Sequence, residues 1–290
     1  MTEITKRIIT SIILVSLLFI LFAVGTNLSL IVIIYSVSIL SFYEWLQLTS
    51  KSRYYVIPFI ILLASLDFYN LIDIYLFNLV FFIFLLVLVI FTFACQSYLR
   101  LKIKQYSLPF GIFIIVSLFL YLINLHPYDN TLISDINLID NKHYFIILIS
   151  LVSFIDMSAY ISGKLIGRNR IHSEISPNKT YEGYIGSVLF TLIFFILGAN
   201  YLSFQWTNLD ILLLFLFTVS VFYGDLLISL VKRIFEVKDS GSLLPGHGGI
   251  LDRLDSYFTS LPVFYMWFLF EFSKYSRVYR LYWEKYFRGS

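Results

Sequence analysis

Long apolar runs, separated by short polar segments, make up most of the amino-acid sequence. Hydrophobic residues occupy 59% of the 290 positions and charged residues only 13%, against roughly a quarter in ordinary soluble domains. A soluble fold of this length could not bury so much apolar surface, whereas a bilayer lets apolar side chains face lipid. The sequence therefore predicts an integral membrane protein and excludes a soluble globular domain.

A membrane-spanning helix needs about 20 predominantly apolar residues. The sequence therefore predicts an all-α, polytopic integral membrane protein with about nine transmembrane helices. The expected spans are residues 8–24, 28–48, 54–71, 74–95, 108–124, 143–163, 184–204, 210–231 and 257–272. The first span follows Lys6 and Arg7, as in a signal peptide, but it is long for one and no A-x-A cleavage pattern follows. A retained helix is the better interpretation.

Lys and Arg residues are unequally shared between alternate loops. Beyond the N-terminus they gather in residues 51–53, 100–104, 164–179 and 232–253, whereas Asp prevails in the intervening loops. Because basic loops stay on the cytoplasmic side of a membrane, this asymmetry places the N-terminus and the two large basic loops in the cytoplasm. The basic and aromatic residues of 274–288 have the spacing of an interfacial amphipathic helix, and their side of the membrane stays open.

Asp156 and Asp225 lie inside expected spans, where a charge is costly and usually functional. Asp156 precedes Lys164 by eight residues and Asp225 precedes Lys232 by seven, which places each acid roughly 10–12 Å below its basic loop. Equal depth favours one polar cavity open to the cytoplasm over two acids that each bond only a neighbouring helix. For Glu44, near the cytoplasmic end of the second span, we favour an interfacial position over a catalytic one.

The densest polar chemistry of the chain begins inside the eighth span. Asp225 and Ser229 are four residues apart and share a helix face, which Lys232 extends by one turn. Arg233 and Lys238 add positive charge near the membrane surface. Together these groups suit a polyphosphate, which is multiply anionic.

Three glycines surround His247, namely Gly246, Gly248 and Gly249. Such residues let the backbone approach a ligand, and their amides can hold phosphate oxygens. A tight connector between helices is the alternative, but the charged groups on both sides favour phosphate binding. For His247 we favour a phosphate-contacting or structural role over that of a general base, because an ionised phosphate can attack without one.

A pair of carboxylates follows the glycines. Asp252 and Asp255 are three residues apart, so on a helix they face the same way. Carboxylates beside phosphate-binding cations suit Mg²⁺, which takes oxygen ligands from one or two carboxylates and from substrate phosphates. Asp225 could complete the set, and Asp239 is a further candidate. A salt bridge from Arg253 to a nearby acid is the alternative, and both can hold.

The other basic loop, residues 164–183, is rich in cations and hydroxyl groups. Such a loop suits a nucleotide triphosphate or a lipid headgroup, although basic residues there could also serve membrane topology alone. For Lys179, beside Thr180 and Glu182, we favour a functional role. Ser176-Pro177 predicts a turn.

Residues 229–255 follow the pattern S-x-x-K-R-x-x-x-x-K-D-x-G-x-x-L-P-x-H-G-G-I-x-D-R-L-D. This pattern resembles the signature of the phosphatidate cytidylyltransferases, or CDP-diacylglycerol synthases. Upstream, Asp-Met-Ser-Ala-Tyr at 156–160 is similar to the family's Asp-Thr-Gly-Ala-Tyr, and Ser-Pro-Asn-Lys-Thr-Tyr-Glu-Gly at 176–183 to its Ser-Pro-Lys-Lys-Thr-Trp-Glu-Gly. The first five spans resemble the family in hydropathy alone.

The resemblance implies an enzyme that condenses CTP with phosphatidic acid, giving CDP-diacylglycerol and pyrophosphate for phospholipid biosynthesis. It implies a homodimer in a bacterial-type cell inner membrane, with the active site facing the cytoplasm, Mg²⁺ and a second cation such as K⁺, and no nucleic-acid partner. We expect one continuous membrane domain, with N-terminal transmembrane helices in residues 1–142 and the catalytic region in residues 143–290.

The candidate residues fall into three groups. The expected catalytic residues are Asp225, Asp252, Asp255, Lys232 and Arg233. The expected substrate-binding residues are Ser229, Lys238, His247, Gly248, Gly249, Arg253, Asp156, Lys179, Thr180 and Glu182. The expected metal ligands are Asp225, Asp252, Asp255 and Asp239.

Two other functions stay open on the sequence. The first is another lipid-phosphate nucleotidyltransferase, which the same motifs would fit. The second, from a different class, is an ion-coupled transporter that uses Asp156 and Asp225 as a relay. Such a transporter would be expected to have two matching halves with broken helices, and it would leave the basic, glycine-rich segment unexplained.

Overall fold

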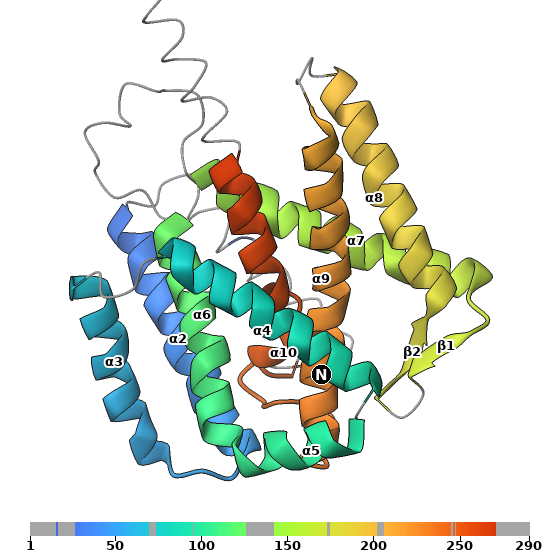
Figure 1. The fold of residues 1–290 in the computed structure, drawn as a ribbon. Coiled ribbons are helices and arrows are strands. Elements are labelled where there is room, and N and C mark those ends of the chain that lie inside the picture. The colour runs from blue at the N-terminus through green and yellow to red at the C-terminus, as the bar shows by residue number, and fades with distance from the viewer. Residues whose placement is uncertain are drawn as a thin grey trace, which may run out of the picture.

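The computed structural model describes residues 16, 27–69, 74–94, 96–125, 142–172, 175–201, 206–244, 246 and 248–270. The helices are α2 (Asn27–Leu48), η1 (Arg53–Tyr55, a 3-10 helix), α3 (Val56–Tyr69), α4 (Ile74–Ala94), α5 (Gln96–Gln105), α6 (Ser107–Leu125), α7 (Lys142–Ile166), α8 (Tyr181–Tyr201), α9 (Asn208–Ile234) and α10 (Leu251–Leu254). A further helix, here called the C-terminal helix, covers residues 257–270. The all-α class is confirmed, apart from one small hairpin, β1 (Arg170–His172) and β2 (Ser176–Thr180) (Figure 1).

Five of the described helices are long and apolar enough to cross a membrane. They are Leu28–Leu48, Ser107–Leu125, Tyr144–Ile166, Tyr181–Tyr201 and Asn208–Ile234, and each coincides with an expected span. The chain is therefore a multi-pass membrane protein. α3 has only 14 residues, and the expected span 8–24 lies outside the described residues except for Ser16. The total of about nine spans and the division at residue 142 stay predictions.

The N-terminal helices pack through large apolar and aromatic side chains. Trp45 of α2 is almost fully buried and occupies the space beside Gly111 of α6, where a side chain would collide with the indole ring. The Trp45 Nε1–H group donates a hydrogen bond of 2.9 Å to the Ser107 carbonyl, which satisfies the buried polar end of the ring. These contacts fix the end of α2 against the start of α6.

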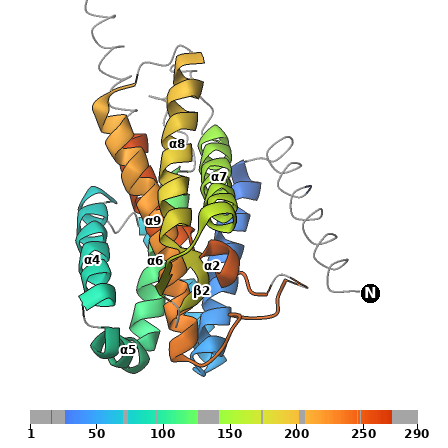
Figure 2. The same ribbon diagram turned by 90° about the vertical axis from the view of Figure 1, so that its right-hand side faces the viewer.

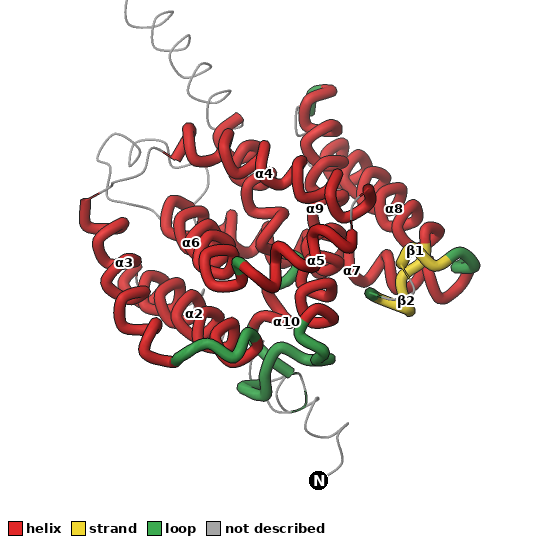
Figure 3. Tube along the Cα trace, turned by 60° about the horizontal axis from the view of Figure 1, so that its bottom comes forward, coloured by secondary structure: helices red, strands yellow, loops and turns green. Residues whose placement is uncertain are grey.

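Small residues bring α7 and α8 together, side by side (Figures 1 and 2). Gly163 and Gly183 face one another closely, and the Ser162 hydroxyl donates a 3.0 Å hydrogen bond to the Gly183 carbonyl. Small side chains and hydroxyl groups are what helix contacts in a membrane need, because backbones must approach closely there. Figure 3 shows the β1–β2 hairpin at the junction of these two helices, apart from α2, α3 and α6.

The hairpin corrects one local expectation. Ser176 and Pro177 do not form a turn but begin β2, which pairs antiparallel with β1. Pro177 is tolerated there because a two-stranded hairpin has only edge strands, where a missing N–H group need not break a ladder.

The C-terminal helix runs antiparallel to α9. The Thr259 hydroxyl donates a hydrogen bond to the Ser220 carbonyl, and Trp267 Nε1 donates one of 3.0 Å to Asp210 at the other end of α9. At Gly224, a side chain would come within 2.4 Å of the Asp255 carbonyl oxygen. The absence of a Cβ therefore lets the returning chain lie against α9. As a result α10 lies beside α9 rather than beyond its end (Figure 1).

Candidate active site

A cavity of about 420 Å³ lies among α7, β2, α8 and α9. Its lining includes Asp156 and Lys164 of α7, Lys179 and Thr180 of β2, and Asp225 of α9. The expectation that Asp156 and Asp225 share one polar cavity is therefore met by their positions. Lys164 lies in the last turn of α7, not in the loop, because the helix continues to Ile166.

Within this cavity, Asp225 has two polar partners among the described residues. Its carboxylate forms a salt bridge with Lys179 and accepts a 3.2 Å hydrogen bond from the Ser229 hydroxyl, one turn further along α9. The Lys179 ammonium also lies 4.7 Å from the centre of the Phe222 ring, a favourable cation–π arrangement. Lys179 is thus held where an anion entering the cavity would meet it.

Asp255 lies close to Asp225, although they belong to different segments. Removal from water, followed by the nearby negative charge of Asp225, holds the pKa of the Asp255 carboxyl well above its ordinary value. Gly224 causes this proximity, because the backbone of Asp255 packs directly on it. Two carboxylates in such a position repel one another unless a proton or a cation lies between them.

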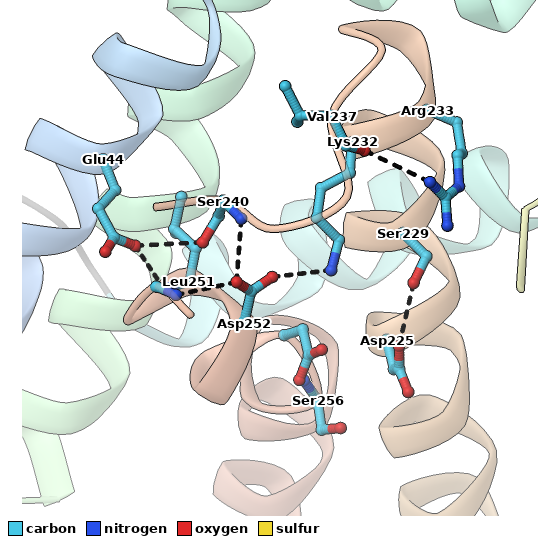
Figure 4. Close-up of polar contacts among 12 residues, drawn as sticks. Glu44, Asp225, Ser229, Lys232, Arg233, Val237, Ser240, Leu251, Asp252 and Ser256 are labelled. Atoms are coloured by element: carbon cyan, nitrogen blue, oxygen red, sulfur yellow. Dashed lines mark hydrogen bonds and ion pairs between the residues drawn. The ribbon is translucent and has the colours of Figure 1, made fainter. Parts of the chain in front are cut away.

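Asp252 has a different environment, at the N-terminal turn of α10. Its Oδ1 accepts a 2.7 Å hydrogen bond from Lys232, and its Oδ2 accepts hydrogen bonds from the Ser240 and Gly249 amides at 2.9 and 3.0 Å (Figure 4). Burial raises the pKa of Asp252, but Lys232 and the two amides outweigh it, so the net pKa lies below the ordinary value. Asp252 therefore ties both ends of the glycine-rich loop, defined here as residues 236–250.

The glycine-rich loop differs in part from the sequence-based expectation. Two of its amides, those of Ser240 and Gly249, point to Asp252 of the same chain rather than outward. Gly248 has φ +81°, and a side chain there would come within 2.8 Å of Asp252 Oδ2, so both conformation and space require glycine. Pro245 and His247 lie outside the described residues.

The other charged candidates are Arg233, Lys238, Asp239 and Arg253. Arg233 donates a 3.3 Å hydrogen bond to the Ile175 carbonyl, which joins α9 to the turn before β2. Lys238, Asp239 and Arg253 have exposed side chains. Asp239 thus lies at the surface of the glycine-rich loop, and its role as a metal ligand stays a prediction.

Thr180 and Glu182 serve the local fold at the start of α8. The Thr180 hydroxyl accepts a 3.1 Å hydrogen bond from the Gly183 amide, as an N-cap does. Glu182 accepts hydrogen bonds from the Arg168 and Asn169 amides at 3.0 and 3.2 Å. Thr180 also lines the cavity, whereas Glu182 braces the connection between α7 and β1.

Sequence reasoning gave Glu44 no part in the site. Glu44 is fully buried within the protein, and it accepts hydrogen bonds from the Leu251 amide at 2.9 Å and the Ser240 hydroxyl at 3.2 Å (Figure 4). The available signal was an acid inside an apolar span, which is costly without a purpose. It could not name the partners, which lie about two hundred residues away along the chain.

The acids near Asp225 fit a divalent cation of the Mg²⁺ type. In the described part of the chain, no group of three or more His, Cys, Asp or Glu side chains is gathered closely enough to hold an ion alone. Mg²⁺, however, is usually held by one or two carboxylates together with substrate phosphates. The neighbouring carboxylates of Asp225 and Asp255 meet that requirement and would lose their mutual repulsion on binding.

Comparison with known proteins agrees with the signature. A model described as the cytidylyltransferase family matches residues 5–270. A phosphatidate cytidylyltransferase of Staphylococcus haemolyticus is 47% identical over 128 residues, which cover 43% of this chain and 48% of that protein. The proteins of the same name from Staphylococcus saprophyticus and Staphylococcus aureus are 42% and 43% identical over 128 and 126 residues, with the same coverage. The chain thus spans about half the length of the curated relatives it matches.

Proposed function

The chain belongs to the cytidylyltransferase family, and on that premise we propose that it transfers the cytidylyl group of CTP to phosphatidic acid. The products are CDP-diacylglycerol and pyrophosphate. The observation that carries the proposal is the salt bridge between Lys179 of β2 and Asp225 of α9 at a cavity between membrane helices, with the Asp255 carboxyl close enough to feel the charge of Asp225. Relatives named phosphatidate cytidylyltransferase support the choice of substrates.

The proposed reaction is an in-line displacement at phosphorus. A phosphate oxygen of phosphatidic acid forms a bond to the α-phosphorus of CTP, while the bond from that phosphorus to the bridging oxygen of the β-phosphate breaks. Charge grows on the α-phosphoryl oxygens and on the departing pyrophosphate. Fixed cations aimed at those oxygens stabilise such a transition state.

Within the described part of the chain, Lys179 and Lys232 are the lysines that form salt bridges with acids of the site, Asp225 and Asp252. Both lysines therefore have defined positions before substrate binds. We assign Lys179 to the lipid phosphate, because it lines the cavity among helices. We assign Lys232, with Arg233 and Lys238, to the triphosphate, because these residues lie around the end of α9 and the glycine-rich loop.

Mg²⁺ would be held by Asp225 and Asp255, with Asp252 as a further candidate, and would neutralise phosphate charge during the transfer. Lys179 then has a second role, because its ammonium group would pair with Asp225 until Mg²⁺ binds there. The second cation, such as K⁺, is a proposal carried by the family resemblance alone.

Exposed side chains of α7 support entry of the lipid from the side. Tyr160, which lines the cavity, is 68% exposed, and Leu165, further along α7, is 76% exposed; in a membrane such surfaces face acyl chains. CTP would enter from the cytoplasm, where the positive-inside rule places the basic loops. We propose a bacterial inner membrane and a homodimer, the latter testable by the mass of the protein in lipid nanodiscs.

A labelling assay tests the proposed function. Purified protein in nanodiscs is incubated with CTP labelled at the α-phosphate, phosphatidic acid and Mg²⁺, and a labelled lipid is expected. Parallel reactions offer ATP in place of CTP, or an isoprenoid phosphate in place of phosphatidic acid. Labelled lipid only from an isoprenoid phosphate would assign another lipid-phosphate nucleotidyltransferase, and no labelled lipid from any pair would overturn the proposal.

A further inference from the structure

Glu44 connects the N-terminal helices to the glycine-rich loop and to the start of α10, the short helix that carries Asp252. It lies on α2, and both of its hydrogen-bond donors lie near the two ends of the glycine-rich loop: the Ser240 hydroxyl and the Leu251 amide. Ser240 donates its own amide to Asp252, whose partner amide comes from Gly249. The carboxylates of Glu44 and Asp252, which come from distant segments, therefore both join the chain at residue 240 to the chain at residues 249–251 (Figure 4).

The fit around Glu44 is tight on both sides. A methyl group added at Gly241 would come within 2.7 Å of Glu44 Oε1, and one at Gly249 within 2.4 Å of Glu44 Oε2. Real Cβ atoms are essentially never found so close. The carboxylate thus lies between two glycines of the family signature, and those glycines provide space for Glu44 as well as flexibility for the loop.

The anchor for this carboxylate is rigid. The next residue, Trp45, is 1% exposed and is hydrogen-bonded to α6, so α2 cannot rotate without disrupting a well-packed core. One oxygen of Glu44, Oε1, is buried and has no hydrogen-bond partner within the described residues. Such a buried acceptor carries a free-energy cost because it has lost its hydrogen bonds to water. Glu44 therefore costs free energy where it sits on α2, and its favourable contacts are those with the Leu251 amide and the Ser240 hydroxyl.

We propose that Glu44 is a positioning residue for the active site. It holds residues 240 and 249–251 so that Asp252 stays oriented toward Lys232, and it acts through the loop without contact to substrate. The inference rests on the proposed function only in the activity assay, which measures cytidylyl transfer. The contact itself can be tested without any substrate.

Glu44→Ala is the first test variant. Removal of the acceptor should lower kcat/KM for CTP about 10- to 100-fold, as for other supporting residues of phosphate and metal sites. Hydrogen–deuterium exchange should rise in peptides of residues 236–251 and stay unchanged in α6 and α8. Glu44→Gln keeps an oxygen acceptor for Leu251 and Ser240, so it should restore most of both properties.

A double-mutant cycle tests the contact from the side of the loop. Gly241→Ala should lower activity in the wild-type background, because its methyl group meets the Glu44 carboxylate. In the Glu44→Ala background the same change should cost little more, because the colliding atoms are gone. Gly198→Ala is the matched control, since nothing lies within 4 Å of a methyl group there, and it should leave both measurements unchanged.

A second control separates positioning from general stability. Asn78→Ala removes a buried acceptor of the N-terminal helices, the 2.9 Å partner of Tyr121, without touching the loop. It should lower the melting temperature and leave KM for CTP unchanged. The proposal is overturned if Glu44→Ala leaves exchange of the loop unchanged, if it loosens all helices equally, if Glu44→Gln is as damaged as Glu44→Ala, or if the Gly241 and Glu44 effects add.

Discussion

Asp225 at the cavity and Asp252 beside the glycine-rich loop are each paired with a lysine, but the two aspartates have opposite surroundings. Asp225 contacts one lysine and one hydroxyl group at the edge of an open cavity. Asp252 contacts a lysine and two backbone amides that close a loop. A carboxylate with exchangeable side-chain partners can accept a ligand, whereas one that holds backbone amides cannot leave them without loosening the chain. On the proposed function, the comparison therefore favours Asp225 as the acid central to the reaction, and it gives Asp252, the further candidate ligand, mainly the role of supporting the loop.

The largest expected effect is that of Asp225→Asn. Loss of the charge should reduce turnover by at least about 10²- to 10³-fold, the usual cost of one transition-state-stabilising group. The melting temperature should stay near that of the wild type, because the side chain faces a cavity and holds no backbone. Initial rates of lipid labelling and thermal unfolding in nanodiscs check both results. A near-normal rate would remove Asp225 from the chemistry.

Asp252→Asn should cost less in rate and more in stability. We expect a loss of activity of about 10- to 100-fold, together with destabilisation of about 1.5–3 kcal/mol for weakened bonds to a charged group. Thermal unfolding and hydrogen exchange of residues 236–251 measure the second effect. If Asp252→Asn keeps a firm loop but abolishes turnover, the two aspartates share the same role and the comparison fails.

The two lysines should divide between the two substrates. Lys179→Met should raise KM for phosphatidic acid roughly tenfold, and Lys232→Met should raise KM for CTP by a similar factor, as expected for one charge-assisted hydrogen bond of about 1.5 kcal/mol. Initial rates with each substrate varied in turn distinguish them. Equal effects of both variants on both substrates would contradict separate subsites.

Glu182→Gln should have the smallest effect. The side chain braces the Arg168 and Asn169 amides outside the cavity, and Gln retains an acceptor. We expect a change in kcat/KM of less than about fivefold, or 1 kcal/mol. Ser153→Ala is a neutral control, since Ser153 is exposed and its hydroxyl, as far as the described residues show, bonds the Ile149 carbonyl of its own helix. A loss as large as that of Asp225→Asn would place Glu182 in the reaction itself.

The membrane class and the main helices follow from the sequence because hydropathy is a local property. The spans around Asp156 and Asp225 were expected within a few residues, and both acids do line one cavity. The hairpin is not predicted from the sequence, because Ser176-Pro177 fits a turn as well as the start of a strand unless the partner strand is known.

Long-range packing is what the sequence could not provide. The position of α10 beside α9 depends on Gly224, because a side chain there would collide with the Asp255 carbonyl. A single glycine inside an apolar run does not reveal this partner. The contacts of Glu44 could not be predicted for the same reason, since its partners lie in the other half of the chain. Sequence spacing named the charged groups but not which of them would be paired, exposed or enclosed.

Binding of Mn²⁺ in place of Mg²⁺ tests the central claim most directly. Electron paramagnetic resonance on purified protein with a non-reactive CTP analogue reports the bound ion and its coupling to phosphorus. We predict one tightly bound ion coupled to phosphorus in the wild type, lost in Asp225→Asn and retained in Glu182→Gln. Equal Mn²⁺ affinity in the wild type and Asp225→Asn would contradict a reaction centred on Asp225 and Asp255.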